Sequence, residues 1–211
     1  MNKRVSIVIP CRNEEKYIGK CIDSIINSSY DKILLEVCIC DGMSSDKTRE
    51  VLAPYLKLPF VKLIDNPSKT TPQALNLGIK NSIGDIIIIL GSHAEIFPDY
   101  IDKCVSILES NPIIGCAGGV LENVIEDSTS AMIAKAMSSP FGVGNAHFRT
   151  GTKEGFVDTV AFGAYPKEVF AKAGLFDEQL IRNQDDEFNF RLIQNGYKNF
   201  LSSSIRAKYY V

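Results

Sequence analysis

Two kinds of hydrophobic pattern alternate along the first half of the chain. Continuous apolar runs at residues 5–10 and 35–40 are typical of buried strands, and a third run covers residues 61–64. Between them, apolar residues recur at the spacing of one helical face over residues 18–26 and 51–56. This alternation predicts strands that pair in parallel, joined by helices that cover the sheet.

The same alternation continues through the middle of the chain. Thr71 followed by Pro72 is typical of a helix start, and this helix is predicted to lead into a strand over residues 85–90. Ser44 and Ser45 are the predicted N-cap of the second helix, because a Ser side chain accepts hydrogen bonds from the first turn. The connections are therefore short and strongly polar.

The pattern weakens in the second half. A helix is predicted to open at Pro98, but beyond Cys116 only a short strand over residues 157–162 and a helix over residues 188–192 are indicated. The whole pattern predicts a single α/β domain with a Rossmann-like, doubly wound, mostly parallel sheet and helices on both faces.

Composition agrees with one globular domain. The chain has 211 residues, of which 45% are hydrophobic and 23% are charged, which is enough to bury one good-sized core. The net charge is -2, and Lys and Arg are spread along the whole sequence. Since no basic stripe is present to neutralise a phosphate backbone, nucleic acid is not expected as a partner.

Cysteine usage and the N-terminal sequence favour a cytoplasmic protein. Six cysteines are too few for a disulfide scaffold, and Cys38 and Cys40 would point to opposite faces of a strand, which argues against a shared zinc ion. The N-terminus lacks a signal-peptide core, and the longest aliphatic run, residues 86–90, is far shorter than the roughly 20 residues that cross a bilayer. We expect the protein in the cytoplasm, either free or at the inner face of the cell membrane.

Polar clusters follow three of the predicted strands, at residues 10–15, 41–46 and 91–95. Because the carboxyl ends of parallel strands meet at one edge of a sheet, these clusters are expected to converge on a ligand site. No Gly-x-Gly-x-x-Gly sequence follows the first strand, and no Walker-type Gly-Lys-Ser/Thr sequence occurs. A divalent cation is therefore expected to neutralise phosphate groups that no loop of backbone amides cradles.

A fourth polar cluster, residues 182–187, contains Asp185, Asp186 and Glu187 in succession. One interpretation is that acidic residues favour a helix N-terminus. The other is that one of these carboxylates acts as a general base.

Five short motifs resemble, in their order and spacing, the family 2 glycosyltransferases of the GT-A fold. The motifs are Val5-Ser6-Ile7-Val8-Ile9-Pro10 with Arg12-Asn13-Glu14-Glu15, Asp41-Gly42 with Ser45-Asp46-x-Thr48, Asn76-x-Gly78, Gly84-Asp85, and Asp185 with Arg191. The resemblance covers nearly the whole chain. It implies an enzyme of the hexosyltransferase type that moves a sugar from a nucleotide sugar to a hydroxyl during assembly of a surface polysaccharide or glycolipid.

A narrower likeness is to the succinoglycan glucosyltransferase type, whose members build exopolysaccharide repeats on a lipid carrier. The residues that carry it are Ser92-His93-Ala94, Phe141-Gly142-Val143-Gly144, Arg149, Val157-Asp158-Thr159 and Arg182-Asn183-Gln184-Asp185-Asp186-Glu187.

The resemblance implies a donor site in the first half of the chain. Pro10, Arg12, Glu14 and Asp41 would hold the nucleotide, with Ser92 beside them. An Asp at a strand end can accept a hydrogen bond from the imide N–H of uracil, and a Glu can accept from ribose hydroxyls. A UDP-sugar is therefore the expected donor. The alternative is that these are ordinary turn and cap residues.

The metal motif departs from the family pattern. The fourth strand of these enzymes normally ends in Asp-x-Asp, whereas this chain has Gly91-Ser92-His93. The mucin-type N-acetylgalactosaminyltransferases use an Asp-x-His version, and His is a competent ligand for manganese-like ions, so His93 is predicted to bind Mn²⁺ or Mg²⁺. The lost acid at Gly91 leaves donor affinity and metal dependence open, with Glu95 as a candidate replacement.

Asp185 aligns with the catalytic base of the family. It is expected to take the proton from the acceptor hydroxyl while that oxygen attacks the anomeric carbon, and a single displacement of this kind inverts the anomeric configuration. Gly142, Gly144 and Arg149 would belong to a loop on the acceptor side, and His147 is expected to be structural or incidental.

The resemblance also implies a division of labour. Residues 1–115 would form the nucleotide-binding half, and residues 116–211 the acceptor and catalytic half, of one domain. Relatives of this type commonly continue into further segments, so acceptor-binding and membrane-associated parts are expected beyond residue 211. The expected partners are a nucleotide-sugar donor and a saccharide or lipid-linked acceptor.

Two other functions stay open. A sugar nucleotidyltransferase would share the sheet, but it normally carries a Gly-rich loop where this chain has Pro10-Cys11-Arg12-Asn13. A non-catalytic nucleotide-sugar-binding domain is compatible with Gly91, and turnover would separate it from an enzyme.

Overall fold

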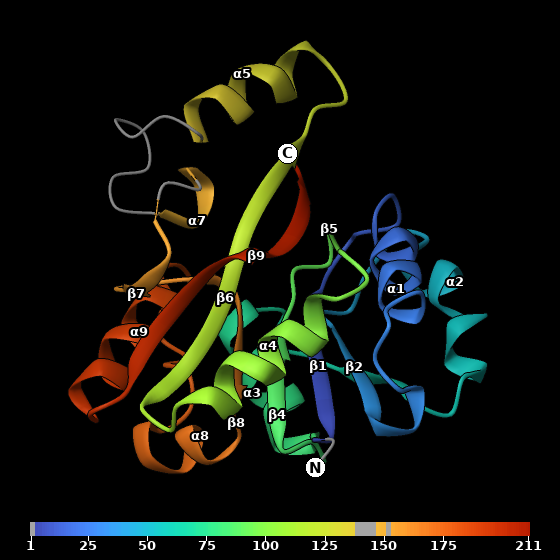
Figure 1. Ribbon diagram of the computed structural model, residues 1–211. Helices are drawn as coiled ribbons and strands as arrows, with labels where there is room; N and C mark the ends of the chain where they lie inside the picture. The colour runs from blue at the N-terminus through green and yellow to red at the C-terminus, as the bar shows by residue number, and fades with distance from the viewer. Residues whose placement is uncertain (1–2, 138–146, 151–152) are drawn as a thin grey trace.

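The computed structural model describes residues 3–137, 147–150 and 153–211. Within this part of the chain the strands form one mixed sheet, in the order β3-β2-β1-β4-β8-β6-β9-β5, and β7 pairs with β9. Figure 1 shows helices packed on both sides of this sheet. The predicted α/β architecture with helices on both faces is confirmed.

The first four strands are parallel neighbours and follow the predicted pattern closely. They are β1 (Val5–Cys11), β2 (Leu35–Asp41), β3 (Val61–Asp65) and β4 (Ile86–Ile89). The last residues of β1, β2 and β3, namely Cys11, Asp41 and Asp65, lie opposite one another in the register. The polar segments that follow these strands therefore leave the sheet at one edge.

Two hydrophobic cores lie on opposite faces of the sheet, because successive strand residues point to opposite sides. Ile7 and Ile9 of β1 are fully buried in the core that contains α1 and α4, whereas Val8 is buried in the core that contains α3, α8 and α9. The helices of the two layers are α1 (Ile18–Ile26), α2 (Thr48–Leu52), α3 (Thr71–Asn81), α4 (Tyr100–Ser110), α8 (Glu168–Ala173) and α9 (Gln184–Gln194).

Two long parallel strands that the hydrophobic pattern did not indicate organise the second half. They are β6 (Ile114–Val124) and β9 (Lys198–Tyr210), which run side by side across the middle of Figure 1. Because β6 begins at Ile114, it crosses the expected division at residue 115, and the roles of the two halves stay a prediction.

The remaining elements complete this sheet or follow β6. The strand β8 (Ala161–Pro166) lies antiparallel between β4 and β6, and β5 (Ala94–Ile96) and β7 (Gly155–Val157) are antiparallel to β9. The other helices are α5 (Ser128–Met137), α7 (His147–Thr150) and the short η1 (Lys32–Leu34) and η2 (Tyr55–Lys57).

The predicted N-cap of the second helix is wrong. The helix α2 begins at Thr48, and no side chain of its N-cap residue makes a capping hydrogen bond. Ser44 instead donates its hydroxyl to the Asp41 carboxylate at 2.5 Å, and the Ser45 amide donates to the side chain of Asn13 at 2.9 Å. Both serines therefore hold the loop after β2 rather than the helix.

Two predicted boundaries in the second half are also wrong. Residues 157–162 are not one strand, because β7 ends at Val157 against β9 while β8 begins at Ala161 against β4 and β6. The helix predicted over residues 188–192 begins earlier, at Gln184. Asp185 therefore lies in the first turn of α9 rather than in the loop before it.

Close packing between β6 and β9 predicts a large effect of adding one methyl group. A Cβ atom at Gly119 would lie 2.0 Å from the carbonyl oxygen of Ile205, whereas one at Gly19 on α1 would make ordinary contact at 3.4 Å with Val51. We expect Gly119→Ala to lower the free energy of unfolding by about 1–3 kcal/mol and Gly19→Ala to raise it by about 0.5–1 kcal/mol. Urea denaturation of both variants measures this. Equal effects of the two substitutions would contradict the β6 and β9 packing.

All six cysteines are free and buried. Burial raises the pKa of Cys11, the cysteine nearest the functional edge of the sheet, and the charge of Asp41 raises it further. Cys11 is therefore a protonated thiol at neutral pH. Among the helices that the structure describes, none combines the length and the hydropathy needed to span a bilayer.

Candidate active site

Two adjoining cavities open at the carboxyl edge of β1 and β4. The first has a volume of about 330 Å³ and the second about 210 Å³. The residues that line both of them are Pro10, Thr71, Gly91, Phe162 and Tyr209. This shared wall makes the two cavities parts of one cleft, and we call them the donor cavity and the sugar cavity.

The donor cavity collects five of the six residues that were predicted to hold the nucleotide or the metal. These are Pro10, Arg12, Glu14, Ser92 and His93. They come from the loop after β1 and the loop after β4, which the parallel pairing of these strands brings to the same edge. The backbone N–H of Glu14 donates to the Thr48 hydroxyl at 2.8 Å, which anchors the first loop to α2.

His93 and Glu14 form a pair within this cavity. Nδ1 of His93 lies 3.1 Å from Oε1 of Glu14, and the His93 ring packs edge-on against Tyr209, with 4.9 Å between ring centres. A histidine that donates Nδ1–H to a carboxylate presents Nε2 as a ligand in a fixed orientation, which is the usual support of a metal-binding histidine. The position of Glu14 therefore suits a supporting role to His93 as well as the predicted ribose contact.

The side chains of the cavity fit a cation that is completed by substrate oxygens. In the described part of the chain no group of three or more His, Cys, Asp or Glu side chains is arranged to hold a metal ion. His93 would hold one position, and the remaining positions would fall to diphosphate oxygens and water, as is common for Mg²⁺-type ions at phosphate sites. Such a site would form only together with the donor.

Asp41 is placed differently from the prediction. It is fully buried and is absent from the residues lining the donor cavity, where its neighbour Gly42 takes part instead. Its carboxylate accepts hydrogen bonds from Ser44 and from Nε of Arg49, the latter at 2.6 Å, and Arg49 also bridges to Asp65. Asp41 thus fixes the ends of β2 and β3. Its contact with the base of a nucleotide stays a prediction.

Gly91, which replaces an acid of the family motif, faces an aromatic ring. A Cβ atom there would lie 2.9 Å from the ring of Phe162, whose own backbone has a φ of 50° in the left-handed region. Phe162 therefore occupies space that a carboxylate at position 91 would need. Glu95, the candidate replacement, accepts a hydrogen bond from Tyr210 and pairs with Lys208 at 3.8 Å. Glu95 therefore does not replace the missing acid in the donor cavity.

The sugar cavity holds the predicted base. Asp185 lines it from the first turn of α9, next to Gln184, and Arg149 of α7 lines the same cavity. Asp185 is exposed, yet partial desolvation raises its pKa above the ordinary value, and the charge of Asp186 raises it further while Arg149 lowers it. A raised pKa favours proton transfer to the carboxylate near neutral pH.

The other acids of the cluster have different environments. Glu187 binds Arg191 through both carboxylate oxygens, and Arg191 also donates to the carbonyls of Ala173 and Leu175. This pair ties α9 to the end of α8 and is structural. Only Asp185 of the three acids is among the described residues that line the cavity, which favours it over its neighbours as the base.

The charge of Asp186 gives a test of this assignment by pH. Asp186→Asn removes a charge that raises the pKa of Asp185. A base works only when deprotonated, so activity is lost as the pH falls through its pKa, and the acidic limb of the rate profile is expected to move to lower pH in the variant. The pH dependence of kcat with saturating donor measures the shift. A limb that stays in place, or moves to higher pH, would exclude Asp185 as the titrating group.

Several lining residues were missed by sequence reasoning. Tyr209 and Phe162 line both cavities, and Phe148 lines the sugar cavity. Tyr209 lies at the end of β9, far along the chain from the donor loops, and the alternation along β9 is interrupted by three consecutive serines. Lys69 also lines the donor cavity. Gly142 and Gly144 lie outside the described residues.

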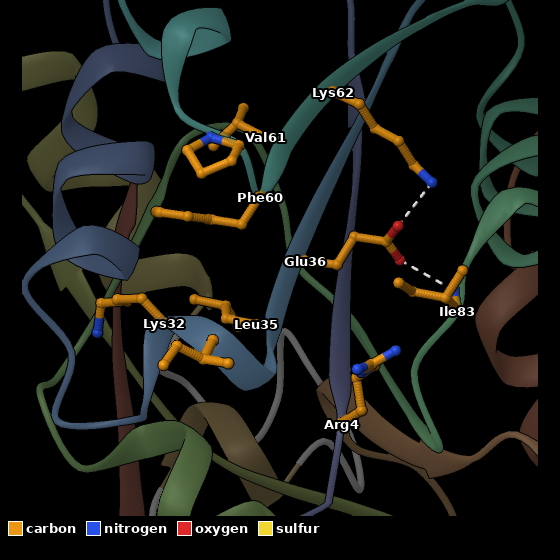
Figure 2. Close-up of a pocket in the computed structure, with 10 residues that line it drawn as sticks. Arg4, Lys32, Leu35, Glu36, Phe60, Val61, Lys62 and Ile83 are labelled. Atoms are coloured by element: carbon orange, nitrogen blue, oxygen red, sulfur yellow. Dashed lines mark hydrogen bonds and ion pairs between the residues drawn. The ribbon is translucent and has the colours of Figure 1, made fainter.

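A larger cavity, of about 460 Å³, lies at the opposite edge of the sheet, beside the amino ends of β2 and β3 (Figure 2). Figure 2 shows Glu36 held there by Lys62 and by the N–H of Ile83. Burial raises the pKa of Glu36, but these two bonds and a third from Ser6 outweigh burial and lower it. The Glu36 carboxylate is fully used in structural hydrogen bonds. The larger volume of this cavity therefore does not make it the candidate active site.

Comparison with known proteins agrees with this geometry. Residues 6–173 match the family model described as Glycosyl transferase family 2. The chain is 37% identical, over 98% of its length and 66% of the relative's, to the dolichyl N-acetyl-alpha-D-glucosaminyl phosphate 3-beta-D-2,3-diacetamido-2,3-dideoxy-beta-D-glucuronosyltransferase of Methanococcus voltae. It is 28% identical to the succinoglycan biosynthesis protein ExoA of Rhizobium meliloti, over 97% of this chain and 62% of ExoA. The chain therefore spans somewhat under two thirds of the length of these relatives.

Solved structures with low sequence identity share the fold. TarS of S. aureus (residues 1–349) superposes with a TM-score of 0.77 at 17% identity, over 99% of this chain and 60% of that one. GalNAc-T7, solved with UDP, GalNAc and Mn²⁺, superposes with a TM-score of 0.78 at 19% identity, over 99% of this chain and 44% of that one. The match to the family model and the 37% identical relative, with the GT-A fold shared by these structures, show that the chain belongs to glycosyl transferase family 2.

Proposed function

We propose that this chain is the catalytic domain of an inverting glycosyltransferase, which moves a sugar from a nucleoside-diphosphate sugar to a hydroxyl of a saccharide or lipid-linked acceptor. The observation that carries the proposal is the single cleft. It joins the cavity lined by Arg12, Glu14 and His93, which we propose to bind the nucleotide and the metal, to a cavity lined by a carboxylate of raised pKa. The sugar of a bound donor would lie where the two cavities meet.

The donor is proposed to be a UDP-sugar. TarS has been solved with UDP and with UDP-GlcNAc, and GalNAc-T7 with UDP and Mn²⁺, while the mannosyltransferase PcManGT of Pyrobaculum calidifontis was solved with GDP-Man and Mn²⁺. The shared chemistry is a nucleoside diphosphate with a divalent cation. A bound cation would supply positive charge to the departing diphosphate, and His93 is the residue that would hold it.

We assign separate roles to the residues of the two cavities. Pro10, Arg12, Glu14 and Ser92 line the pocket for the nucleoside diphosphate. Asp185 accepts the proton of the acceptor hydroxyl as that oxygen forms its bond to the anomeric carbon and the bond to the diphosphate breaks. Attack from the face opposite the leaving group gives inversion.

The acceptor is proposed to be lipid-linked. The name of the Methanococcus voltae relative includes a dolichyl N-acetylglucosaminyl phosphate, and ExoA is a succinoglycan biosynthesis protein. We propose residues 1–115 as the donor half and residues 116–211 as the acceptor and catalytic half. On this view the protein acts in the cytoplasm, at the inner face of the membrane that holds its acceptor.

One observation favours a second candidate, a domain that binds nucleotide sugars without turnover. Phe162 fills the space beside Gly91 where the family motif has an acid. Binding alone would not separate this function from catalysis, so the test must include product formation.

The test is calorimetric titration of the chain with UDP and with GDP, each with and without Mn²⁺, followed by incubation with UDP-sugars and a saccharide acceptor. We expect UDP to bind more tightly with Mn²⁺ and the product to show an inverted anomeric signal by NMR. Absence of nucleotide binding would overturn the site, and retention would overturn the single displacement. Binding without either transfer or donor hydrolysis would favour the non-catalytic candidate.

A further inference from the structure

Arg149 of α7 lines the sugar cavity with part of its guanidinium group unused. The side chain is half-buried, and its Nη1 atom is buried without a hydrogen-bond partner among the described residues. The guanidinium carbon lies 5.4 Å from the ring centre of Phe148 and 5.3 Å from that of Tyr209. Two aromatic rings therefore hold the group, but no acceptor among the described residues satisfies Nη1, and a buried donor without a partner costs free energy.

The charge of Arg149 acts on Asp185, but the remaining walls of this cavity give its Nη1 atom no hydrogen-bond partner among the described residues. They are mainly apolar or aromatic, and the carboxylate among them belongs to Asp185, the proposed base. A neutral sugar ring offers hydroxyl groups, for which Gln184 and Thr71 are available in the same cavity. A guanidinium instead matches the two oxygens of a carboxylate, which accept two parallel hydrogen bonds from it.

The neighbours of Arg149 indicate which part of the substrate it reaches. The Tyr209 ring contacts both the guanidinium of Arg149 and the ring of His93, with 4.9 Å between the Tyr209 and His93 ring centres. Arg149 is thus separated by one aromatic ring from His93, the residue proposed to hold the cation beside the diphosphate. The diphosphate is proposed to bind in the donor cavity, which Lys69, Ser92 and His93 line. The group beyond the diphosphate on this side is the donor sugar.

We infer that Arg149 binds a carboxylate carried by the donor sugar, so that this domain takes a nucleoside-diphosphate uronate rather than a neutral hexose. The inference rests on the proposed function and names its substrate class. Binding of the acid would satisfy Nη1 and place a negative charge against the only guanidinium among the described residues of the sugar cavity.

The test compares matched acidic and neutral donors by calorimetry in the presence of Mn²⁺. UDP-glucuronate is set against UDP-glucose, UDP-galacturonate against UDP-galactose, and UDP alone is the reference. We expect at least one acid to bind about 10-fold to 100-fold more tightly than its neutral partner, as for a hydrogen bond to a charged group. Arg149→Met should erase this preference and leave UDP affinity unchanged, and Arg149→Lys should keep part of it. Arg4→Met, at the opposite edge of the sheet, is the matched control.

Each other result separates the alternatives. Equal binding of acid and neutral donor by the unchanged chain overturns the inference, and so does a loss of UDP affinity in Arg149→Met, which would assign Arg149 to the diphosphate. If Arg149→Met weakens binding of N-acetylglucosamine 1-phosphate but no donor, the anion belongs to the acceptor and the inference is wrong. If UDP does not bind to the unchanged chain at all, the proposed function is wrong, and the inference that rests on it is wrong as well.

Discussion

Asp185→Asn is expected to lower the rate of sugar transfer by about 10²-fold to 10⁴-fold while UDP binds as before. The amide has nearly the shape of the carboxylate, so the start of α9 and the sugar cavity are preserved, but it cannot accept the proton of the acceptor hydroxyl. Asp185 lines the sugar cavity and not the donor cavity, which separates its chemistry from nucleotide binding. The measurements are kcat by release of UDP with acceptor present and the dissociation constant of UDP by calorimetry.

Asp186→Asn is the matched control for this substitution, since it changes the same functional group one residue along the helix. Its kcat at a pH well above the acidic limb should equal that of the unchanged chain. A similar loss of rate in both variants would point to the charge of the helix start rather than to one base. An unchanged rate in Asp185→Asn would remove Asp185 from the mechanism.

The donor half of the site could be predicted from the sequence because it follows from the parallel pairing of strands that the hydrophobic pattern shows. The strands β1, β2 and β4 are buried on both faces and therefore have continuous apolar sequences, each of which ends in a polar loop. Parallel pairing then places these loops together whatever the rest of the chain does. Glu14 and His93, 79 residues apart, meet for this reason.

The rest of the site depends on contacts that no short pattern contains. Tyr209 enters the cleft from the far end of the 13-residue strand β9, and its place follows from the pairing of this strand with β6. The burial of Asp41 follows from Arg49, which reaches it from α2 and bridges to Asp65 on β3. A strand-end aspartate in a polar loop has the same sequence signature whether it faces a ligand or an arginine.

The structure, and not the sequence, explains why position 91 has glycine where the family motif has an acid. Phe162 has a left-handed backbone and places its ring against Gly91, where a Cβ atom would lie 2.9 Å from the ring and would require the ring to shift. The change at position 91 and the aromatic ring at position 162 are therefore two parts of one arrangement. It leaves His93, supported by Glu14, as the metal-binding candidate of the original motif.

His93→Ala is accordingly expected to abolish the gain in UDP affinity that Mn²⁺ confers. The metal would lose its protein ligand, and no cluster of acids among the described residues could replace it. Glu14→Gln should have a smaller effect, a loss of about 10-fold to 100-fold in metal affinity, because it weakens the support of the ligand and not the ligand itself. Calorimetry with UDP at several Mn²⁺ concentrations measures both.

The order of these two effects is the informative result. His147→Ala, which changes the other histidine of the chain, should leave the Mn²⁺ dependence intact. If His93→Ala retains that dependence, the cation is held by the diphosphate alone and the Glu14 pair has another role. If Glu14→Gln instead exceeds His93→Ala, Glu14 is the direct ligand and His93 its support. The 3.1 Å contact between the two side chains is compatible with either order, but Nδ1 of His93 turned toward the carboxylate leaves Nε2 for the metal, and this orientation favours His93.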